Sequence, residues 1–586
     1  MAKRSPSSTR TDRLSSFAPS LAVLLHYRRI WLRGDLLAGV TVAAYLVPQV
    51  MAYSEIAGLP AVVGLWAVVG ALLVYAVLGS SRQLSVGPES TTALMTAAAI
   101  GALGAGDPDR YASFAAALAI AVGLLCLLGY VARLGFLADL LSRPVLVGYM
   151  AGIAVLMVVS QLGKLSGMPV QGDTPLEEAS YAITHLDQAE LPTAALATAV
   201  LVLLLLMQHF RPRWPNPLIV MLLAAATVAL FDLSQYGIDV VGPIPAGLPA
   251  LGLPDVDADL MLELALPAVG VAIVGYSDNV LTARAFGSRH RQRIDANQEF
   301  LALGTANLAS GLLHAFPVSS SGSRTVIGDT LGSRSQLYSL VAVAIVLLTT
   351  WFLGPVLAAF PMAALGGVIV FAAIQLVDVP ELRRIARFRH SELVLSLFTT
   401  AAVLLVGVLP GIGVAIGLSI LDLLRRVARP HDGILGYAAD VPGMHDVDDY
   451  PMAKQVPGLV VYRYDSPIFF ANAEDFHRRA LKAVDESDVP VEWFLLNAEA
   501  NIEVDLTGVD ALEEVRRSLA ERGIVFAMAR VKQDLRDQFD GTDFIEHVGE
   551  ERIFLTLPTA VEAYVREYTA RHGGPPPGVH IPKPPR

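Results

Sequence analysis

The sequence predicts an α-helical polytopic membrane protein followed by a cytoplasmic α/β domain. The chain has 586 residues, of which 54% are hydrophobic and 17% charged, whereas a soluble domain has roughly 25% charged residues. Apolar runs recur from about Leu36 to about Leu424, and several approach the roughly 20 residues that cross a bilayer core. After Arg429 the composition becomes polar, and strand and helix patterns alternate. We therefore expect about fourteen spans and then a soluble domain.

Composition also excludes several classes of protein. The net charge of −11 is modest for this length and gives no reason to expect nucleic acid as a partner. The single cysteine, Cys126, lies in an apolar run, so no internal disulfide can form. No Walker A loop is present, so ATP-driven pumping is not expected. We expect neither an enzyme nor a bound cofactor.

The domain boundaries follow from shifts in composition. The cytoplasmic N-terminal segment expected over residues 1–34 begins with the basic, Ser-rich stretch "MAKRSPSSTRTDRLSS". It lacks a signal-peptide core of roughly 7–15 apolar residues, so the first apolar segment is expected to be a retained span. Residues 35–429 form the expected membrane domain. Residues 430–454 are polar and contain Pro and Gly, which predicts a linker before an α/β domain over 455–572. The Pro-rich tail, 573–586, is expected to be disordered.

The sign of the loop charges predicts the topology. With an even number of spans both termini share a side, and the positive-inside rule places them in the cytoplasm. Loops expected on that side are rich in arginine, as in 284–293 and 383–389, whereas the loop 232–259, expected outside, is acidic. We therefore expect a multi-pass protein of the cell membrane. Arg324 fits neither side.

One apolar run begins in an unusual way, with the stretch "QLSVGPESTTALMTAAAI". From Arg82, near the cytoplasmic interface, an extended segment to Gly87 would reach about 20 Å, close to the middle of the bilayer core. Pro88 suits the first position of a helix, which would then run outward to about Gly104. Glu89 would lie in the first turn of this half-helix, deep in the protein.

A second interrupted run, "HAFPVSSSGSRTVIGDTLGS", has the same character. Its short helix would start near the midplane and run inward, so the N-termini of the two half-helices would converge. Positive helix ends and free N–H groups attract anions. The serines add hydroxyl donors and Arg324 adds a fixed charge; these serines are Ser319, Ser320, Ser321 and Ser323. The alternative is that Ser and Gly only allow close helix packing.

An acidic residue, Asp278, lies in the apolar stretch "GYSDNVLTARAFGS". Thr282 follows four residues later, on the same helical face. A carboxylate within the membrane is a candidate for binding a proton or a cation. The alternative is an ion pair with Arg324 that neutralises both charges.

These segments resemble the sulfate permease (SulP) family of anion transporters. The matching motifs are "GDLLAGVTVAAYLVPQVMAY" in the first span, "LGSSRQLSVGPES" before the third and "FPVSSSGSRT" before the tenth. The resemblance implies inverted repeats of seven spans each, about 35–233 and about 261–429, and a core domain that moves against a gate domain. It also implies an anion site between the third and tenth spans, near the first span. That site would use Gln49, Tyr53, Glu89, Ser90, Ser321, Gly322, Ser323 and Arg324.

Glu89 departs from many relatives, which have a neutral or aromatic residue there. An ionised Glu89 would repel an anion from its own site, so neutralisation of Glu89 or Asp278 would couple proton uptake to anion uptake. The helix end and Arg324 favour the ionised carboxylate, whereas burial favours the neutral acid. In cation-coupled relatives the acidic site of the eighth span binds sodium, which gives Asp278 and Thr282 a second possible role.

The C-terminal part predicts strands at "GLVVYRYD" and "EWFLLNAEA" and a helix at "AEDFHRRALKAV". A strand, an amphipathic helix and another strand are expected over "IEVDLTGVDALEEVRRSLAERGIVFAMAR". The part "VDLTGVDALEEV" resembles the signature of STAS domains. Thr507 is expected to cap the helix, and the resemblance to phosphorylated antagonists gives it a possible regulatory role.

The predicted function is secondary active transport of a small inorganic anion, first of all sulfate, into the cell by proton or sodium symport with an elevator-like motion. Open alternatives are a bicarbonate or carboxylate symporter, an anion exchanger, a nucleobase transporter of the same fold, and a membrane-tethered STAS signalling scaffold. Arg324 and the Ser-rich tenth span disfavour a nucleobase, and a pure anchor needs no broken helices. The expected partners are the anion, the coupling ion, the lipid membrane and a second copy of the chain. The STAS domain would contact that copy or a cytosolic protein.

Overall fold

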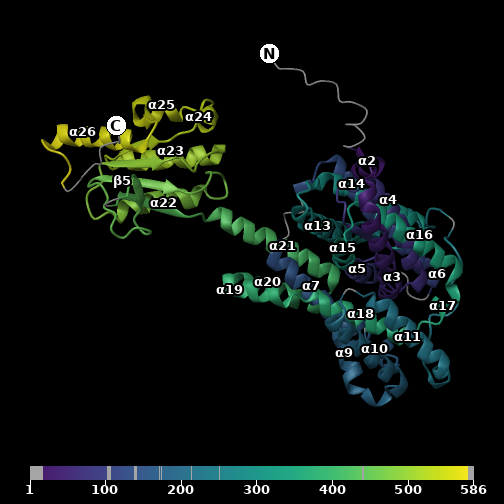
Figure 1. Ribbon diagram of the computed structural model, residues 1–586. Coiled ribbons are helices and arrows are strands. Elements are labelled where there is room, and N and C mark those ends of the chain that lie inside the picture. The colour runs from purple at the N-terminus through teal and green to yellow at the C-terminus, as the bar shows by residue number, and fades with distance from the viewer. Residues whose placement is uncertain are drawn as a thin grey trace. The chain divides into compact units, whose positions relative to one another are not determined.

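The fold is described by a computed structural model covering residues 17–101, 107–136, 142–170, 172, 174–212, 214–249, 251–438 and 441–577 (Figure 1). The chain divides into two units, Met1–Ser419 and Ile420–Arg586, close to the predicted boundary at 429. Residues 1–16 of the predicted N-terminal segment and the tail beyond 577 lie outside the described residues.

The first unit is helical and apolar. Seven of its described helical segments are long and apolar enough to cross a membrane, and four shorter helices are also apolar. Together with three further helices they make the fourteen segments expected from the sequence. In chain order these are α3 (Leu32–Ile56), α4 (Ala61–Leu78), α5 (Ser90–Ile100), α6 (Pro108–Val131), α7 (Arg143–Ser160), α10 (Leu191–Phe210), α11 (Asn216–Leu230), α13 (Ala265–Arg289), α14 (Ala296–Leu312), α15 (Gly322–Thr330), α16 (Leu337–Phe352), α18 (Met362–Leu376), α20 (His390–Val406) and α21 (Val408–Ala428).

Shorter elements connect these segments. They are α2 (Pro19–Leu25), η1 (Arg29–Trp31), β1 (Ser85–Gly87), α8 (Leu162–Ser166), α9 (Pro175–Thr184), η3 (Leu186–Gln188), η4 (Leu233–Tyr236), α12 (Ala258–Glu263), β2 (Ser319–Ser321), α17 (Gly354–Ala358) and α19 (Val379–Phe388).

The spans form two bundles. The core bundle contains α3 to α6 and α13 to α16, in which α14 packs on α6 and α4, and α16 packs on α3. The gate bundle contains α7, α10, α11, α18 and α20, in which α7 packs on α20 and α10 packs on α18. Each bundle thus combines spans from both halves of the chain, as the predicted fold class requires, and Figure 1 shows purple and teal helices intermixed in the core.

Small residues allow the helices to approach closely. A Cβ atom on Gly64 of α4 would lie 2.0 Å from the carbonyl oxygen of Val50 in α3. In the gate bundle, a Cβ on Gly148 would lie 2.0 Å from the carbonyl oxygen of Ser396. Helices in a bilayer gain no hydrophobic free energy by associating, because lipid tails are as apolar as their side chains. Close backbone packing of this kind therefore holds the helices together.

The second unit is a six-stranded sheet in the order β4-β3-β5-β6-β7-β8. β3 pairs antiparallel with β4 and β5, and β5 to β8 run parallel. The strands are β3 (Asp432–Tyr437), β4 (Met444–Asp446), β5 (Leu459–Tyr464), β6 (Trp493–Asn497), β7 (Val525–Ala529) and β8 (Ile553–Phe554).

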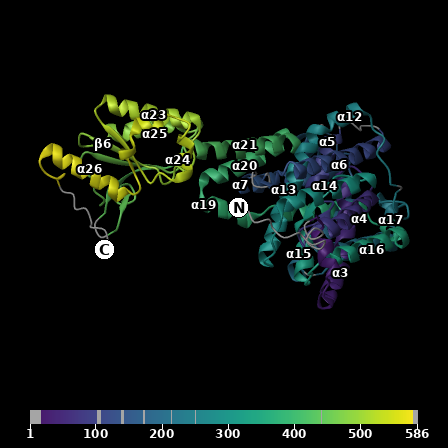
Figure 2. The same ribbon diagram turned by 90° about the horizontal axis from the view of Figure 1, so that it is seen from above.

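Alternating side chains separate two layers of this unit. Phe494 and Leu496 of β6 pack against one face, together with α22 (Ala473–Asp485) and α23 (Leu506–Glu521). Trp493 and Leu495 pack against the other face, together with α26 (Leu557–His572). Figure 2 shows α23 and α26 on opposite sides of the sheet. The remaining helices are α24 (Gln533–Phe539), α25 (Phe544–Val548) and η5 (Glu550–Arg552).

Three predictions about this unit were wrong. Residues 430–454 are not a linker, because β3 and β4 belong to the sheet. The strand expected before α23 is only an isolated bridge between Val504 and Ile468. Thr507 does not cap α23, because Asp505 does so by accepting a hydrogen bond of 2.8 Å from the backbone N–H of Gly508. Thr507 is exposed in the first turn, and its regulatory role stays a prediction.

Candidate functional site

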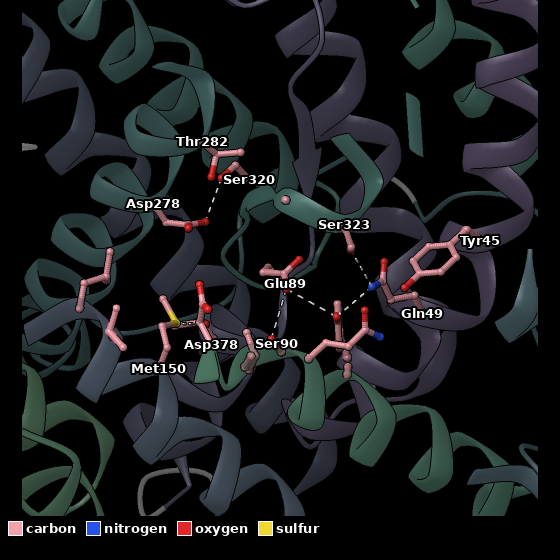
Figure 3. Close-up of a pocket in the computed structure, with 18 residues that line it drawn as sticks. Tyr45, Gln49, Glu89, Ser90, Met150, Asp278, Thr282, Ser320, Ser323 and Asp378 are labelled. Carbon is pink, nitrogen blue, oxygen red and sulfur yellow. Dashed lines mark hydrogen bonds between the residues drawn. The ribbon is translucent and has the colours of Figure 1, made fainter. Parts of the chain in front are cut away.

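A cavity of about 520 Å³ lies between the core and gate bundles. Its core side is formed by α3, the start of α5, α13 and the start of α15, and its gate side by α7, the end of α18 and the residue before α19. Figure 3 shows the carboxyl groups of Glu89 and Asp278 turned towards this space. The lining residues are Tyr45, Gln49, Tyr53, Glu89, Ser90, Thr91, Leu146, Val147, Met150, Asp278, Thr282, Ser320, Gly322, Ser323, Ala372, Gln375, Leu376 and Asp378.

The two broken spans meet as a small antiparallel ribbon. Ser85, Val86 and Gly87 of β1 face Ser321, Ser320 and Ser319 of β2. The segment before β2 is fixed by Asn307 of α14, whose side chain binds both the N–H of Val318 at 2.9 Å and its carbonyl oxygen at 3.0 Å. The strands therefore satisfy each other's backbone at a depth where irregular chain needs protein around it.

Each strand leads directly into a short helix whose N-terminus carries no side-chain cap. α5 begins at Ser90 and α15 at Gly322, and neither Glu89 nor Ser321, the two N-cap residues, makes a cap hydrogen bond. Pro88 and Glu89 therefore precede the helix, whereas the sequence placed them in its first turn. A Cβ on Gly322 would meet nothing within 4 Å, so the N-terminus of α15 is open to the cavity. Uncapped N–H groups with a positive helix end form an anion-binding arrangement.

Arg324 lies behind this arrangement and is fully buried. Its Nη1 donates to Oε1 of Gln49 and to the carbonyl oxygen of Pro88, both at 3.0 Å, and its Nε donates to Oγ of Ser85 at 3.3 Å. Its Nη2 has no partner in the described part of the chain. A Cβ on Gly87 would lie 3.3 Å from Nη2, so a glycine there leaves room for the guanidinium. Arg324 thus fixes the first, third and tenth spans to one another and does not itself line the cavity.

A chain of hydrogen bonds runs from the first span to Glu89. Gln49 donates from Nε2 to the hydroxyl of Tyr53 at 2.9 Å and, more weakly, to Oγ of Ser323 at 3.4 Å. Oε1 of Glu89 accepts from Oγ of Ser90 at 3.2 Å and from the hydroxyl of Tyr53 at 3.5 Å. Oε2 of Glu89 has no partner within the described residues. Glu89 is therefore held in place but incompletely hydrogen-bonded.

Asp278 occupies the other side of the cavity. Its Oδ2 accepts from Oγ of Ser320 in β2 at 2.8 Å. Thr282 lies one turn further along α13 and also lines the cavity. The ion pair considered between Asp278 and Arg324 does not occur among the contacts of the described residues. Carboxylate and hydroxyl oxygens facing one space are suitable ligands for a proton or a hard cation.

The lining has an unusual charge for a site that faces two helix N-termini. It contains three carboxyl groups, on Glu89, Asp278 and Asp378, and no lysine or arginine among the described residues. Asp378 caps α19, because its side chain accepts from the N–H of Glu381 at 2.9 Å.

Away from the cavity, an ion pair connects the two bundles. Nζ of Lys164 in α8 lies 2.7 Å from Oε2 of Glu55 in α3, and the two side chains are 28% and 14% exposed. Because α8 packs on α10 and α18, the pair joins the core bundle to the gate bundle.

The structure brings together most of the residues predicted for the site. Of these, Ser321 and Arg324 lie behind the cavity wall, and the other predicted residues line it. Sequence reasoning missed Tyr45, Gln375 and Asp378. The spacing of Tyr45, four residues before Gln49, was a usable signal, since both lie on the face of α3 that carries Tyr53. Gln375 and Asp378 come from a span that has no polar motif of its own.

Comparisons with known proteins agree with this arrangement. Residues 32–399 match the sulfate permease family, and residues 450–560 match the STAS domain. A probable sulfate transporter of Mycobacterium tuberculosis is 56% identical over 552 residues, which cover 94% of this chain and 99% of the relative. The chloroplastic sulfate transporter 4.1 of Arabidopsis thaliana is 29% identical over 576 residues, which cover 92% and 83%.

Two solved structures share the fold. The inward-facing state of murine Slc26a9 superposes with a TM-score of 0.86 at 22% identity and covers 96% of each chain. The transmembrane domain of the cyanobacterial bicarbonate transporter BicA superposes with a TM-score of 0.58 at 23% identity and covers 67% of this chain and 98% of its own. With a family match over 32–399, the chain belongs to the sulfate permease family, a family of multi-pass transporters and not of enzymes, and it carries a C-terminal STAS domain.

Proposed function

We propose that this protein transports a small inorganic anion, sulfate, into the cell by symport with a cation. The observation that carries the proposal is the convergence of two uncapped helix N-termini, at Ser90 and Gly322, on one cavity. Hydroxyl groups of Ser90 and Ser323 surround that point, as an oxyanion with many acceptor oxygens requires. Sulfate as the substrate is supported by the names of relatives that match nearly the whole chain.

Coupling to a cation is supported by the charge of the cavity. A divalent anion cannot enter a space lined by ionised Glu89 and Asp278 without strong repulsion, and no basic side chain of the described residues lines that space. A proton on a carboxyl group, or a sodium ion between them, removes the repulsion. Anion and cation then bind cooperatively, by the reciprocity of linkage.

The two acidic residues have different surroundings, which supports different roles. Glu89 belongs to the N-terminus of α5 and touches the anion region through Ser90 and Tyr53. Asp278 shares its surroundings with two hydroxyl groups, on Ser320 and Thr282, as a sodium ligand would. We assign proton transfer to Glu89 and the alternative sodium site to Asp278 and Thr282.

An elevator-like motion of the core against the gate is supported by the division of the site. Most of the polar groups lie on the core bundle, and the gate contributes mainly apolar residues such as Leu146, Val147 and Ala372, with Gln375 and Asp378 as its polar members. The Glu55–Lys164 pair, which crosses between the bundles, would have to break during transport. A disulfide-linked bridge, made by a bifunctional methanethiosulfonate reagent between Glu55→Cys and Lys164→Cys, should stop uptake, and a reductant should restore it. Uptake at full rate with the bridge formed would exclude the motion.

The decisive experiment is uptake into proteoliposomes of purified protein. Labelled sulfate, bicarbonate, chloride and a dicarboxylate are compared at two external pH values, with and without a sodium gradient. We expect concentrative sulfate uptake that is driven by a proton or sodium gradient. Uptake of another anion in preference to sulfate would overturn the substrate, and uptake of none would overturn the function. Exchange without any effect of either gradient would overturn symport.

Both termini are proposed to be cytoplasmic. Asp257 is exposed in the loop predicted to be external, and Arg387 is exposed in a loop predicted to be cytoplasmic. Because Cys126 is buried, a cysteine placed at either position can be labelled alone. An impermeant thiol reagent should label Asp257→Cys in intact cells and Arg387→Cys only in inside-out vesicles. The reverse pattern would invert the topology.

A further inference from the structure

A second cavity, of about 490 Å³, lies at one end of the core bundle and shares no lining residue with the first. Its walls come from α2, η1 and the loops at the ends of α4, α13 and α15. Four arginines line it, Arg82, Arg291, Arg293 and Arg334, together with His290. No carboxylate is among its described lining residues. We call this cavity the basic pocket.

The charges of the basic pocket are largely uncompensated. Arg334 donates from Nη1 to Nδ1 of His290 at 3.0 Å, and Nε2 of His290 then donates to Oδ1 of Asp329 at 2.5 Å. This relay compensates Arg334 only. Arg82, Arg291 and Arg293 have no ion pair within the described residues.

Acidic residues close to the pocket in sequence are occupied elsewhere. Asp295 caps α14 by accepting from the N–H groups of Asn297 and Gln298. Asp35 accepts from the backbone N–H of Arg334 at 2.7 Å and from the hydroxyl groups of Tyr27 at 2.9 Å and Ser335 at 2.7 Å, and it forms no ion pair with a pocket arginine among the described contacts. Neither carboxylate lines the pocket. The pocket therefore gathers positive charge that the described protein does not neutralise.

The positive-inside rule alone explains arginines in these loops but not their convergence. The residues come from three separate loops, before β1, after α13 and after α15, yet they surround one space. A guanidinium presents a planar fork of donors that fits the oxygens of a phosphate group. The volume lies in the range of ligand pockets, roughly 300–1,000 Å³.

We propose that the basic pocket binds a phosphate group, either on the headgroup of an anionic phospholipid or on a soluble phosphate ester. A lipid is supported by the rim. Trp31 lines the pocket, and its neighbour Ile30 is 81% exposed, as a lipid-facing residue of a membrane protein would be. Basic pockets at the membrane surface of other proteins bind the headgroups of anionic lipids.

The position of the pocket gives such a ligand a consequence. Arg82 precedes β1 and Arg334 follows α15, so a phosphate bound to both would hold the ends of the two broken spans together. The pocket is separate from the anion cavity, and its occupation does not depend on the proposed function.

The test uses purified full-length protein and two probes. Native mass spectrometry measures binding of dioleoylphosphatidic acid against dioleoylphosphatidylcholine. In phosphatidylcholine nanodiscs, the shift in unfolding temperature measures binding of inorganic pyrophosphate. The pocket variant combines Arg82→Gln with Arg293→Gln. The matched control, Arg133→Gln with Arg387→Gln, removes two exposed arginines outside the pocket, one after α6 and one in α19. A third variant, Arg82→Lys with Arg293→Lys, keeps the charge if the first variant does not fold.

We expect the wild type to bind at least one probe, and the pocket variant to bind it about tenfold more weakly, with the control unchanged and the lysine variant intermediate. Selective loss of phosphatidic acid binding identifies a lipid headgroup, and selective loss of pyrophosphate binding identifies a soluble phosphate compound. The proposal would be overturned if the glutamine variant bound the probe as tightly as the wild type and the control. If the glutamine variant does not fold, wild-type binding by the lysine variant would overturn it. Failure of the wild type to bind either probe would also overturn it.

Discussion

Two carboxylate sites in the core bundle differ in how completely the protein satisfies them. Glu299 of α14 is fully buried and accepts from the hydroxyl of Tyr75 at 3.0 Å, from Nδ2 of Asn279 at 2.5 Å, and from both N–H and Oγ of Ser80 at 2.9 and 2.7 Å. Asp278 lines the cavity and has one described donor, Ser320. Asn279 and Asp278 are consecutive residues of α13, so one helix turn supports a structural site on one side and a cavity site on the other.

The number of hydrogen-bond donors around a carboxylate indicates whether it is available for the proposed coupling. A carboxylate surrounded by several protein donors has most of its acceptor positions occupied and is poorly placed to take up an ion. A carboxylate with vacant lone pairs beside a cavity has acceptor positions available for the proton or cation of the proposed symport. Glu89, whose Oε2 has no described partner, is of the second kind.

Loss of the structural carboxylate should have the largest effect. Glu299→Ala leaves the donors of Tyr75, Ser80 and Asn279 unpaired in the interior, where each hydrogen bond to a charged group contributes about 1.5–3 kcal/mol. We expect a loss of about 3 kcal/mol or more of stability, measured as a lower unfolding temperature in detergent and a poor yield of folded protein. Asp278→Asn, the matched control on α13, should unfold close to the wild type. Equal unfolding temperatures for all three proteins would remove the distinction between the sites.

Substitution of Arg324 tests whether transport needs a residue that lies behind the cavity wall and positions the groups around it. Arg324→Ala removes the guanidinium that holds Gln49 and the carbonyl oxygen of Pro88, so we expect sulfate uptake to fall about 100-fold, equivalent to about 2.7 kcal/mol. Arg324→Lys should restore only part of it, since an ammonium cannot reproduce the fork of donors. Initial rates in proteoliposomes, normalised to inserted protein, measure this. Wild-type affinity and rate in Arg324→Ala would place the anion elsewhere.

We expect substitutions of Glu89 and Asp278 to differ in how uptake depends on pH and sodium, and not in the stability of the protein. If Glu89 carries the proton, Glu89→Gln keeps anion binding intact or tighter but abolishes the pH dependence of accumulation. Asp278→Asn should retain the pH dependence and change the affinity or the effect of sodium. Uptake is measured over a pH series with and without sodium. An unchanged pH profile in Glu89→Gln would mean that Glu89 only stabilises the N-terminus of α5, by roughly 0.3–1 kcal/mol.

The smallest effect is expected for a carboxylate at the surface of the STAS domain. A hydrogen bond from Arg516 lowers the pKa of Glu513, and the charge of His547 acts in the same direction. Because the folded-state pKa is lowered, this contribution is present above the unfolded pKa and is lost as pH falls through the folded pKa. Glu513→Gln should therefore destabilise α23 slightly at pH 7, by less than about 1 kcal/mol, and by nothing at strongly acidic pH. Hydrogen exchange of the α23 amides at both pH values measures this. A larger difference in stability between the wild type and Glu513→Gln at acidic pH than at pH 7 would contradict a lowered pKa of Glu513.

Local sequence patterns were enough to predict most of the spans and strands. The apolar runs predicted the fourteen segments, since a span must be about 20 apolar residues long or be visibly interrupted. The two interruptions, at Pro88 and in the serines before Arg324, predicted the short helices, because each follows an extended segment and Pro88 suits the first position of a helix. Alternation of apolar residues predicted β5, β6 and β7. Each of these signals is local, and local patterns can be read without knowing what packs against them.

The surroundings of each polar group became known only from the packing of the folded chain. It placed Arg324 behind the cavity wall, made Asp505 rather than Thr507 the cap of α23, and added β3 and β4 to the sheet in place of a linker. It also separated Glu299 from Asp278 by the number of donors around each. These outcomes depend on atoms distant in sequence, and the free energy of a buried charge or an edge strand is set by those neighbours rather than by its own residue type.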